Sequence, residues 1–273
     1  MSNMKGFLRG AILVWLFVAG VVMSASAQRY FDGEKLFYRA AYRAKLIPNT
    51  EVGEVTVETT SDTLAGKDVF RVRGNGRTLP SWRWFYNLND TYRSYVDTTT
   101  FRPVLSTSQI RENGYRAWTR FEYDWDNGVS ANTKQRRHDP PTEHRIPIEG
   151  ESYDGVSLFY DLRTIDPTTL VEDEDRTIAL LLNDTVRYIN YRYLGRERKK
   201  VRNVGTFRTL KFSCQLATST GESFEDGSEF FIWISDDRNK IPVFFESPIR
   251  VGSVRAYISK FEGLRFPVES LED

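Results

Sequence analysis

Apolar and polar residues alternate with a period of two along most of this chain, and helical periodicity is scarce. Successive side chains of a β-strand point to opposite faces, so this pattern indicates strands with one buried face. Aromatic residues, which suit pleated and half-buried surfaces, make up 14% of the chain. The predicted strands are 34–43, 53–59, 69–73, 92–96, 104–110, 117–124, 177–182, 186–194, 207–216, 229–234, 241–246 and 254–261. Turn signals at 65–67 and 126–128 connect neighbouring strands into hairpins.

These short connections make an antiparallel meander the simplest topology. We therefore expect an all-β fold in which a large twisted antiparallel sheet curls into an open barrel or forms a two-layer sandwich. The middle of the chain differs. Residues 134–145 (KQRRHDPPTEHR) are polar, contain two prolines and have no periodicity, which predicts a loop. Residues 154–165 predict one helix, because apolar residues recur every three positions up to Asp166–Pro167, and Ser152 or Asp154 could cap its start.

The N-terminal segment is typical of a secretory signal peptide. Lys5 and Arg9 precede an uncharged apolar run, 11–23, which is followed by the small residues Ala25 and Ala27. The run is short for a transmembrane helix, which needs roughly 20 residues, although an uncleaved anchor is the alternative. We expect residues 1–27 to be removed, leaving a single β-rich domain, 28–273, with no transmembrane span. The protein would then be exported to the periplasm or the periphery of the outer membrane.

Composition narrows the possible chemistry. The 38 Lys and Arg residues balance 37 Asp and Glu residues, which argues against a nucleic-acid-binding protein. There is one cysteine, Cys214, and two histidines, so neither an internal disulfide nor a Cys- or His-rich metal site is expected. Cys214 alternates with apolar residues in 210–216, which predicts a buried strand position rather than a catalytic thiol. Nucleotide-binding and common hydrolase motifs are missing from the sequence, and we expect no cofactor.

The segment 82–86 (WRWFY) is the most conspicuous candidate for a binding surface. Four aromatic residues in five cannot all face one way, so some must be exposed; they could contact a ligand or a membrane, or close one end of the core. A helical turn is expected here, since Pro80 and Ser81 suit a helix start. It would pair Trp82 with Phe85 and leave Trp84 apart. We assign ligand binding to Trp82, Trp84 and Tyr86.

Charged clusters offer weaker candidates. The run 196–202 contains five basic residues and could bind an anionic lipid or polymer, or form the solvated tip of a hairpin. Acidic residues crowd 222–229, where Asp226 and Glu229 could serve as the paired carboxylates of a glycan hydrolase. Acidic crowding is also common on solvated turns.

Several segments in order along the chain resemble the exported bacterial family catalogued as domain of unknown function 3108. They are Gly33–Tyr38, Trp84–Tyr86, Asp90–Tyr92, Ser94–Asp97, Tyr153–Arg163, Gly205–Phe207, Leu210–Phe212, Phe231–Asp237, Ile241–Val243 and Gly252–Val254. The resemblance implies an exported, β-rich envelope protein and assigns no catalytic residue.

From the residues themselves, we expect a non-catalytic cell-envelope protein that binds an apolar or amphipathic ligand, such as a lipid or lipid-linked glycan, or an envelope protein. Curled sheets enclose concavities, and this chain has aromatic side chains to line one. An envelope hydrolase acting on glycan and a purely structural module are the alternatives.

Overall fold

The computed structural model describes residues 31–44, 47–148, 152–182, 185–217, 229–248 and 252–272. The predicted signal peptide, 1–27, lies outside the described residues, as does Asp226. No helix in the described part of the chain is long and apolar enough to cross a membrane.

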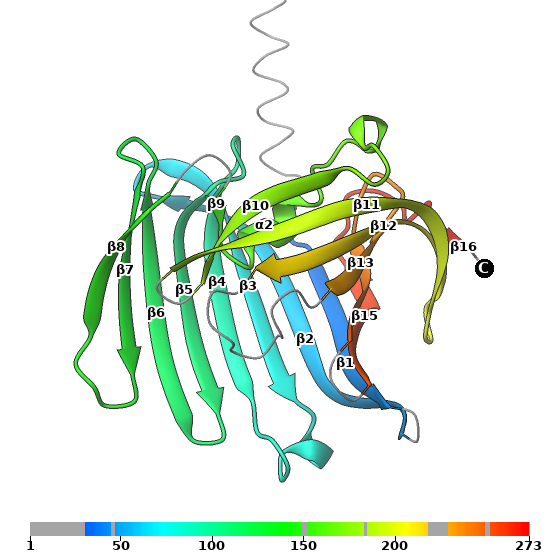
Figure 1. The fold of residues 1–273 in the computed structure, drawn as a ribbon, viewed down its shortest axis with the longest axis horizontal. Coiled ribbons are helices and arrows are strands. Elements are labelled where there is room, and N and C mark those ends of the chain that lie inside the picture. The colour runs from blue at the N-terminus through cyan, green and yellow to red at the C-terminus, as the bar shows by residue number, and fades with distance from the viewer. Residues whose placement is uncertain are drawn as a thin grey trace, which may run out of the picture.

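Strands dominate the structure, as the period-two pattern predicts (Figure 1). In the first half these are β1 (Lys35–Ala44), β2 (Ile47–Leu64), β3 (Lys67–Thr78), β4 (Asn89–Asp97), β5 (Pro103–Glu112), β6 (Tyr115–Asp124), β7 (Val129–Arg136) and β8 (Thr142–Pro147). The second half contributes β9 (Ser152–Tyr153), β10 (Asp175–Leu182), β11 (Thr185–Val201), β12 (Gly205–Ala217), β13 (Glu229–Ser235), β14 (Pro242–Pro248), β15 (Ser253–Glu262) and β16 (Leu271–Glu272). The helical elements are α2 (Ser157–Asp161) and the 3₁₀ helices η1 (Pro80–Trp82) and η2 (Pro167–Thr169).

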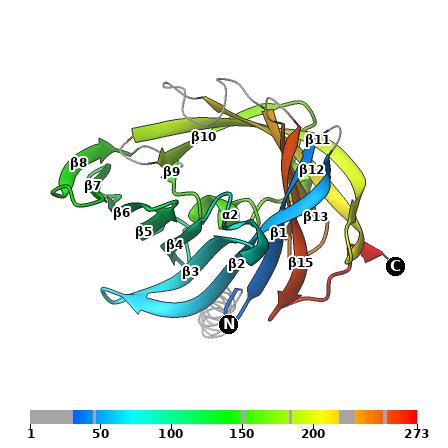
Figure 2. The same cartoon turned by 90° about the horizontal axis from the view of Figure 1, so that it is seen from below.

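All sixteen strands belong to one sheet, whose main path runs β8-β7-β6-β5-β4-β3-β2-β1-β15-β14-β13-β12-β11-β10-β9. Pairing is antiparallel except between β9 and β10, which confirms the predicted meander. The first and last long strands, β1 and β15, pair with each other, so the two edges of the sheet, β8 and β9, are consecutive in the chain. The sheet curls around a central space without closing (Figure 2), which is the open-barrel form of the predicted fold.

Within the described residues, side-chain packing bridges the open side of the curled sheet. Leu181 of β10 packs in one buried cluster with Ile146 of β8 and Phe121 of β6. Elsewhere, the predicted alternation holds: on β12, Leu210, Phe212 and Cys214 are all buried. Cys214 is buried, which confirms its predicted place in the core, and this burial raises the pKa of its thiol to about 12.

The predicted helix is present but shorter than 154–165. Asp154 Oδ1 accepts backbone N–H bonds from Val156 (2.8 Å) and Ser157 (3.1 Å), as expected of a capping residue. After Asp161 the backbone bonds tighten: Arg163 N donates to Tyr160 O and Thr164 N to Asp161 O. These three-residue steps end the helix as a tight turn.

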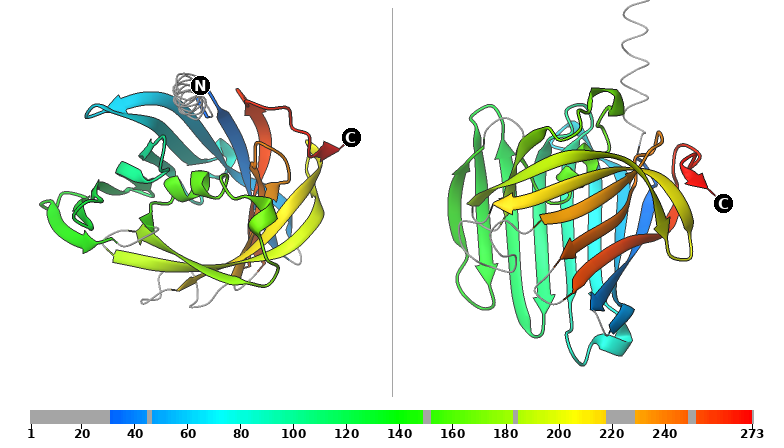
Figure 3. Two further views of the ribbon diagram at one scale, coloured as in Figure 1. Left: turned by 90° about the horizontal axis from the view of Figure 1, so that it is seen from above. Right: turned by 45° about the vertical axis from the view of Figure 1, so that its right-hand side comes forward.

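The helix α2 lies inside the curl of the sheet (Figure 3). Its Tyr160 ring meets Phe31 edge-on, with centroids 4.9 Å apart, and its Phe159 ring lies 6.4 Å from that of Tyr38 on β1. The helix therefore fills part of the concavity and leaves the rest to the pockets described below.

The prediction of a loop over 134–145 is wrong. Residues 134–136 end β7, residues 142–145 lie in β8, and Lys134 is the cross-strand partner of Thr142. The alternation was hidden because the buried positions of β7 are themselves polar: Ser130, Asn132 and Lys134. Strand β8 is a largely exposed edge, which needs few apolar residues.

Candidate functional site: an aromatic-lined pocket at one end of the sheet

The connection between β3 and β4 forms the helical turn that its sequence predicts. Pro80 begins η1, where its fixed φ suits a helix start. Trp82 N donates to Leu79 O (2.9 Å), and Phe85 N and Tyr86 N both donate to Trp82 O (3.0 and 3.1 Å). Leu79 N donates to Val52 O of β2, which ties the start of the turn to the sheet. The aromatic side chains thus project from an ordered turn.

The four aromatic side chains of this turn differ in exposure. Trp84 is 80% exposed, Phe85 72% and Tyr86 40%, whereas Trp82 is half-buried. The expected grouping of Trp82 with Phe85 is wrong: the rings of Trp84 and Phe85 contact each other, with centroids 5.9 Å apart. The 3₁₀ helix spans only Pro80–Trp82, so Phe85 lies beyond its last residue.

An apolar pocket of about 730 Å³ lies between this turn and strands β1–β3. All three residues that the sequence assigned to ligand binding, Trp82, Trp84 and Tyr86, line it. The pocket is further bounded by Ala40, Tyr42, Val52, Val55, Phe85 and Leu88. Its volume falls within the range of small-molecule sites, roughly 300–1,000 Å³.

A glycine on the inner face of β3 keeps part of this space open. A Cβ atom at Gly76 would point toward Leu88 Cδ2 and Val55 Cγ2, 3.8 Å from each. These are ordinary contact distances, so a side chain there would fit the backbone but occupy the pocket. Glycine weakens a strand interior, and it often marks a place where a ligand approaches closely.

A group of polar side chains lies beside the apolar lining. Tyr86 Oη donates a hydrogen bond to Glu112 Oε2 (2.7 Å), which raises the pKa of Tyr86 to about 12. Asp90 is buried nearby and accepts a bond from the backbone N–H of Arg111 (2.8 Å). Burial, reinforced by the Glu112 carboxylate, raises the pKa of Asp90 to about 6. Apolar walls with adjacent hydrogen-bonding groups suit an amphipathic ligand better than a purely hydrocarbon one.

A second hollow, of about 620 Å³, lies on the inner face of β4–β7 and has a mixed polar and apolar lining. Asp154 is buried there and accepts a hydrogen bond from Ser94 Oγ (2.7 Å). Burial raises the pKa of Asp154. In the described residues, no three His, Cys, Asp or Glu side chains group so that they could hold a metal ion.

The basic cluster that the sequence analysis identified gives weaker support for a binding site, because several of its charges are paired within the protein. In the run 196–202, Arg196 pairs with Asp236 (2.8 Å), Arg198 with Glu272 (3.0 Å) and Arg202 with Glu51 (3.7 Å). These residues are at the β11–β12 hairpin, as the alternative interpretation predicted.

Of the two candidate catalytic carboxylates, Asp226 lies outside the described residues. Glu229 is exposed at the start of β13, where it accepts a hydrogen bond from Ser213. The structure therefore describes no carboxylate pair at this place.

Comparison with known proteins agrees with this architecture. The profile of the family DUF3108, described as a protein of unknown function, matches residues 38–259. The chain belongs to this family. The DUF3108 match spans β1 to β15 and includes the whole aromatic turn. Among curated proteins, no significant sequence relative is found.

Solved structures similar to this DUF3108 protein include a β-barrel-like protein of the family DUF1849 from Brucella abortus. It has 9% sequence identity and a TM-score of 0.55, and the match covers 85% of this chain and 98% of that one. A candidate lipoprotein from Parabacteroides distasonis matches at 12% identity with a TM-score of 0.34, covering 85% of this chain and 96% of that one. The first similarity supports the open-barrel fold, and the second is too distant to add to it.

Proposed function

We propose that this protein is a non-catalytic binding protein of the cell envelope, whose ligand is an apolar or amphipathic molecule such as a lipid or lipid-linked glycan. The ligand occupies the apolar pocket under the aromatic turn. The N-terminal sequence supports export, because its basic start, short apolar run and small residues are those of a signal peptide.

The observation that carries the proposal is the combination of an open apolar pocket with highly exposed aromatic side chains. Trp84 and Phe85 remain exposed beside a pocket of about 730 Å³, although both are large enough to bury substantial apolar area. An exposed apolar patch on a soluble surface marks an interaction site. A bound alkyl or acyl chain would cover these rings and fill the space that Gly76 leaves.

Native mass spectrometry of protein purified from the periplasm tests this directly. We expect a co-purifying lipid that survives gentle ionisation and is lost on denaturation. In a second arm, delipidated protein is titrated with a fatty acid labelled with a bromine quencher, and tryptophan fluorescence is followed. Quenching should be strongest for Trp84, so Trp84→Phe should remove most of the signal while leaving an apolar ring in place.

A pair of glycine variants provides the matched control. Gly76→Val places a side chain in the pocket, whereas Gly74→Val adds the same atoms to the same face of β3 outside it, 4.0 Å from Tyr92 Cβ. We expect Gly76→Val to weaken binding of the brominated fatty acid at least about tenfold, the effect of losing 1.4 kcal/mol. Gly74→Val should bind as wild type. Clean apo protein together with equal binding by both variants would overturn the proposal.

A further inference from the structure

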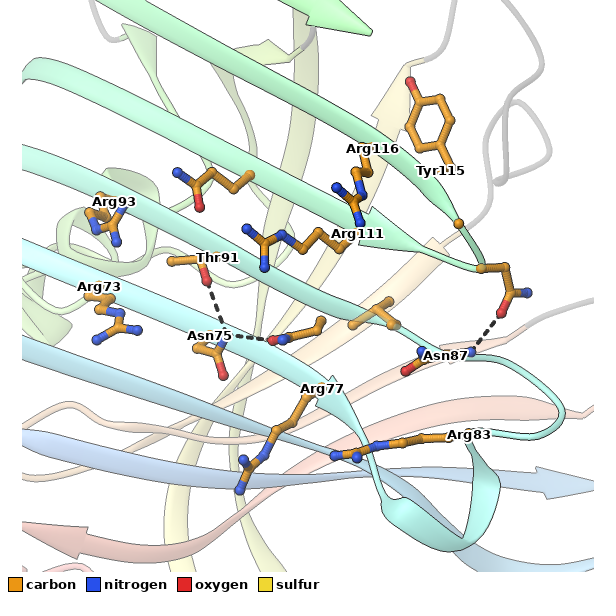
Figure 4. A pocket seen from close by; sticks show the side chains of 15 residues that line it. Arg73, Asn75, Arg77, Arg83, Asn87, Thr91, Arg93, Arg111, Tyr115 and Arg116 are labelled. Atoms are coloured by element: carbon orange, nitrogen blue, oxygen red, sulfur yellow. Dashed lines mark hydrogen bonds between the residues drawn. The ribbon is translucent and has the colours of Figure 1, made fainter. Parts of the chain in front are cut away.

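The outer face of β3–β6 contains another pocket, of about 780 Å³, whose lining is chemically opposite to that of the apolar pocket under the aromatic turn (Figure 4). None of the residues that line this pocket is acidic, and six of them are arginine: Arg73, Arg77, Arg83, Arg93, Arg111 and Arg116. The six come from three strands of the meander, β3, β4 and β5, from the start of β6 and from the aromatic turn.

The sheet register explains why these side chains gather. Arg73 on β3 is the cross-strand partner of Arg93 on β4, and Arg111 on β5 is the partner of Arg116 on β6. Partners in a sheet share one face, so each pair presents two guanidinium groups side by side. Arg73 and Arg77 alternate with Val72 and Gly76 of the inner face, which places the arginines outside.

Most of this charge is not balanced by the protein. Within the described residues, Arg73, Arg93, Arg111 and Arg116 make no ion pair. Glu58, which faces Arg73 from β2, forms an ion pair with Lys35 at 3.5 Å. Among the residues that the structure describes, Arg77 is the one arginine of the six with a carboxylate partner, Glu54 at 2.5 Å. Like charges directly opposite each other destabilise a sheet. A bound anion would therefore relieve the repulsion between these arginine side chains.

Hydrogen bonds hold the pocket in shape before any ligand arrives. Asn75 lies between the arginine rows, and its Nδ2 donates to Asn89 Oδ1 (3.2 Å), Asp90 O (2.9 Å) and Thr91 Oγ1 (3.1 Å). At one end, Asn87 N donates to Asn113 Oδ1 (2.8 Å), which joins the aromatic turn to the β5–β6 hairpin. Arg83 Nε donates to Thr78 O (3.3 Å) and so directs its guanidinium over this face.

We infer that this pocket is a binding site for a compact ligand bearing several phosphate groups. Guanidinium groups bind phosphate through paired, charge-assisted hydrogen bonds, and several convergent arginines require several anionic groups. The asparagine, threonine and glutamine side chains between them supply neutral hydrogen bonds to the ligand's hydroxyl groups. The site is independent of the apolar pocket, because it lies on the other face of the sheet.

Isothermal titration calorimetry with inorganic tripolyphosphate at low ionic strength tests the site. Two double variants remove the same charge from the same face. Arg93→Gln/Arg111→Gln takes it from the pocket, whereas Arg71→Gln/Arg120→Gln takes it from arginines already paired with Asp62 (3.2 Å) and Glu122 (2.5 Å). We expect the first pair to raise the Kd about tenfold or more and the second to change it less than about threefold.

The stability of the unliganded protein provides a readout that ligand binding does not affect. Because Arg93 and Arg111 each face another arginine, Arg93→Gln/Arg111→Gln should raise the Tm by roughly 1–3 °C. The control pair should lower it slightly, since it breaks two ion pairs. A structural role for the arginines would give the reverse order.

Vesicle flotation then identifies the source of the phosphate. Capture by phosphatidylglycerol vesicles but not by phosphatidylcholine vesicles, reversed by tripolyphosphate, would identify a lipid headgroup. Tripolyphosphate binding without vesicle capture would identify a soluble phosphorylated molecule. No binding of either probe, or equal weakening by both double variants, would overturn the anion site. Neither result would affect fatty-acid binding, which Gly76→Val reports separately.

Discussion

Arg163, just after α2, makes a buried ion pair with Glu34, and breaking it should destabilise the protein strongly. The two side chains are 1% and 3% exposed, and Arg163 donates to both Glu34 oxygens at 2.5 and 2.8 Å. Its Nε and Nη2 also donate to Asn239 O (3.1 and 3.0 Å), and the guanidinium lies 4.6 Å from the centre of the Phe31 ring. One side chain thus holds together the residues just before β1, the interior helix and the β13–β14 turn.

Removing one partner of a buried pair leaves the other charge desolvated and uncompensated. For Arg163→Ala this costs about 3–5 kcal/mol, which is about 6–20 °C in Tm for a chain of this size. Replacing both charges by apolar side chains of similar volume, as in Glu34→Leu/Arg163→Met, avoids the uncompensated charge. The double variant should therefore be considerably more stable than Arg163→Ala, even though it contains more changes.

Urea unfolding at pH 7, followed by circular dichroism, measures these differences if the slope m stays constant. Glu34→Leu completes the cycle with Arg163→Met and the double variant. We expect a coupling of several kcal/mol between the two positions. Additive losses, or a loss below about 1 kcal/mol for Arg163→Ala, would refute the reasoning, because they would mean that the pair is hydrated or not formed.

Three further predictions concern individual side chains. Because the pKa of Asp90 is raised to about 6, the native state holds a proton between about pH 4 and 6 that the unfolded chain releases, so stability falls as pH rises through this window. Asp90→Asn, which keeps the oxygen that accepts from Arg111, should be more stable than wild type by up to about 3 kcal/mol at pH 8 and equal to it near pH 4 in urea melts. The Cys214 thiol should react with a maleimide only on unfolding, and Cys214→Ser should cost about 1–3 kcal/mol; rapid labelling of native protein would contradict its burial. Trp82→Ala should cost roughly 1–3 kcal/mol and Trp84→Ala less than about 0.5 kcal/mol; equal large losses in thermal melts would show that both are core residues.

The sequence predicts the local structure of this protein well and its long-range closure poorly. The β2–β3 hairpin is evident from Ala65–Gly66, which adopt the positive φ angles, 50° and 79°, that a tight turn requires. No local sequence pattern predicts that β1 pairs with β15, because alternation determines which face of a strand is buried but not which strand lies beside it. Strand β7 is missed for a different reason. Its buried side chains are polar, and alternation can be recognised in a sequence only when the buried face is apolar.

The two candidate pockets differ in how far sequence reasoning can reach them. The aromatic turn is conspicuous because its residues are consecutive, and all three residues assigned to binding line one pocket. Arg73, Arg93 and Arg111 are separated along the chain and attract no notice until the sheet register brings them together. The signal that could have found two of them is alternation itself, since Arg73 and Arg93 occupy outward positions on the predicted strands 69–73 and 92–96, whereas Arg111 lies one residue beyond the predicted strand 104–110 and belongs to β5 only in the structure. Conversely, the prominent basic run 196–202 has several of its charges neutralised by ion pairs.

Strand β3 carries residues on both faces that lower the stability of a sheet. Its inner face has Gly74 and Gly76 in the middle of a twelve-residue strand, where glycine costs roughly 0.5–1 kcal/mol each relative to alanine. Its outer face sets Arg73 against Arg93, an unfavourable pair. Selection for stability alone would favour a β-branched residue inside and an acidic one outside. Space on one face and unbalanced positive charge on the other are both features that a bound molecule would use, so the strand's composition is better explained by binding than by folding.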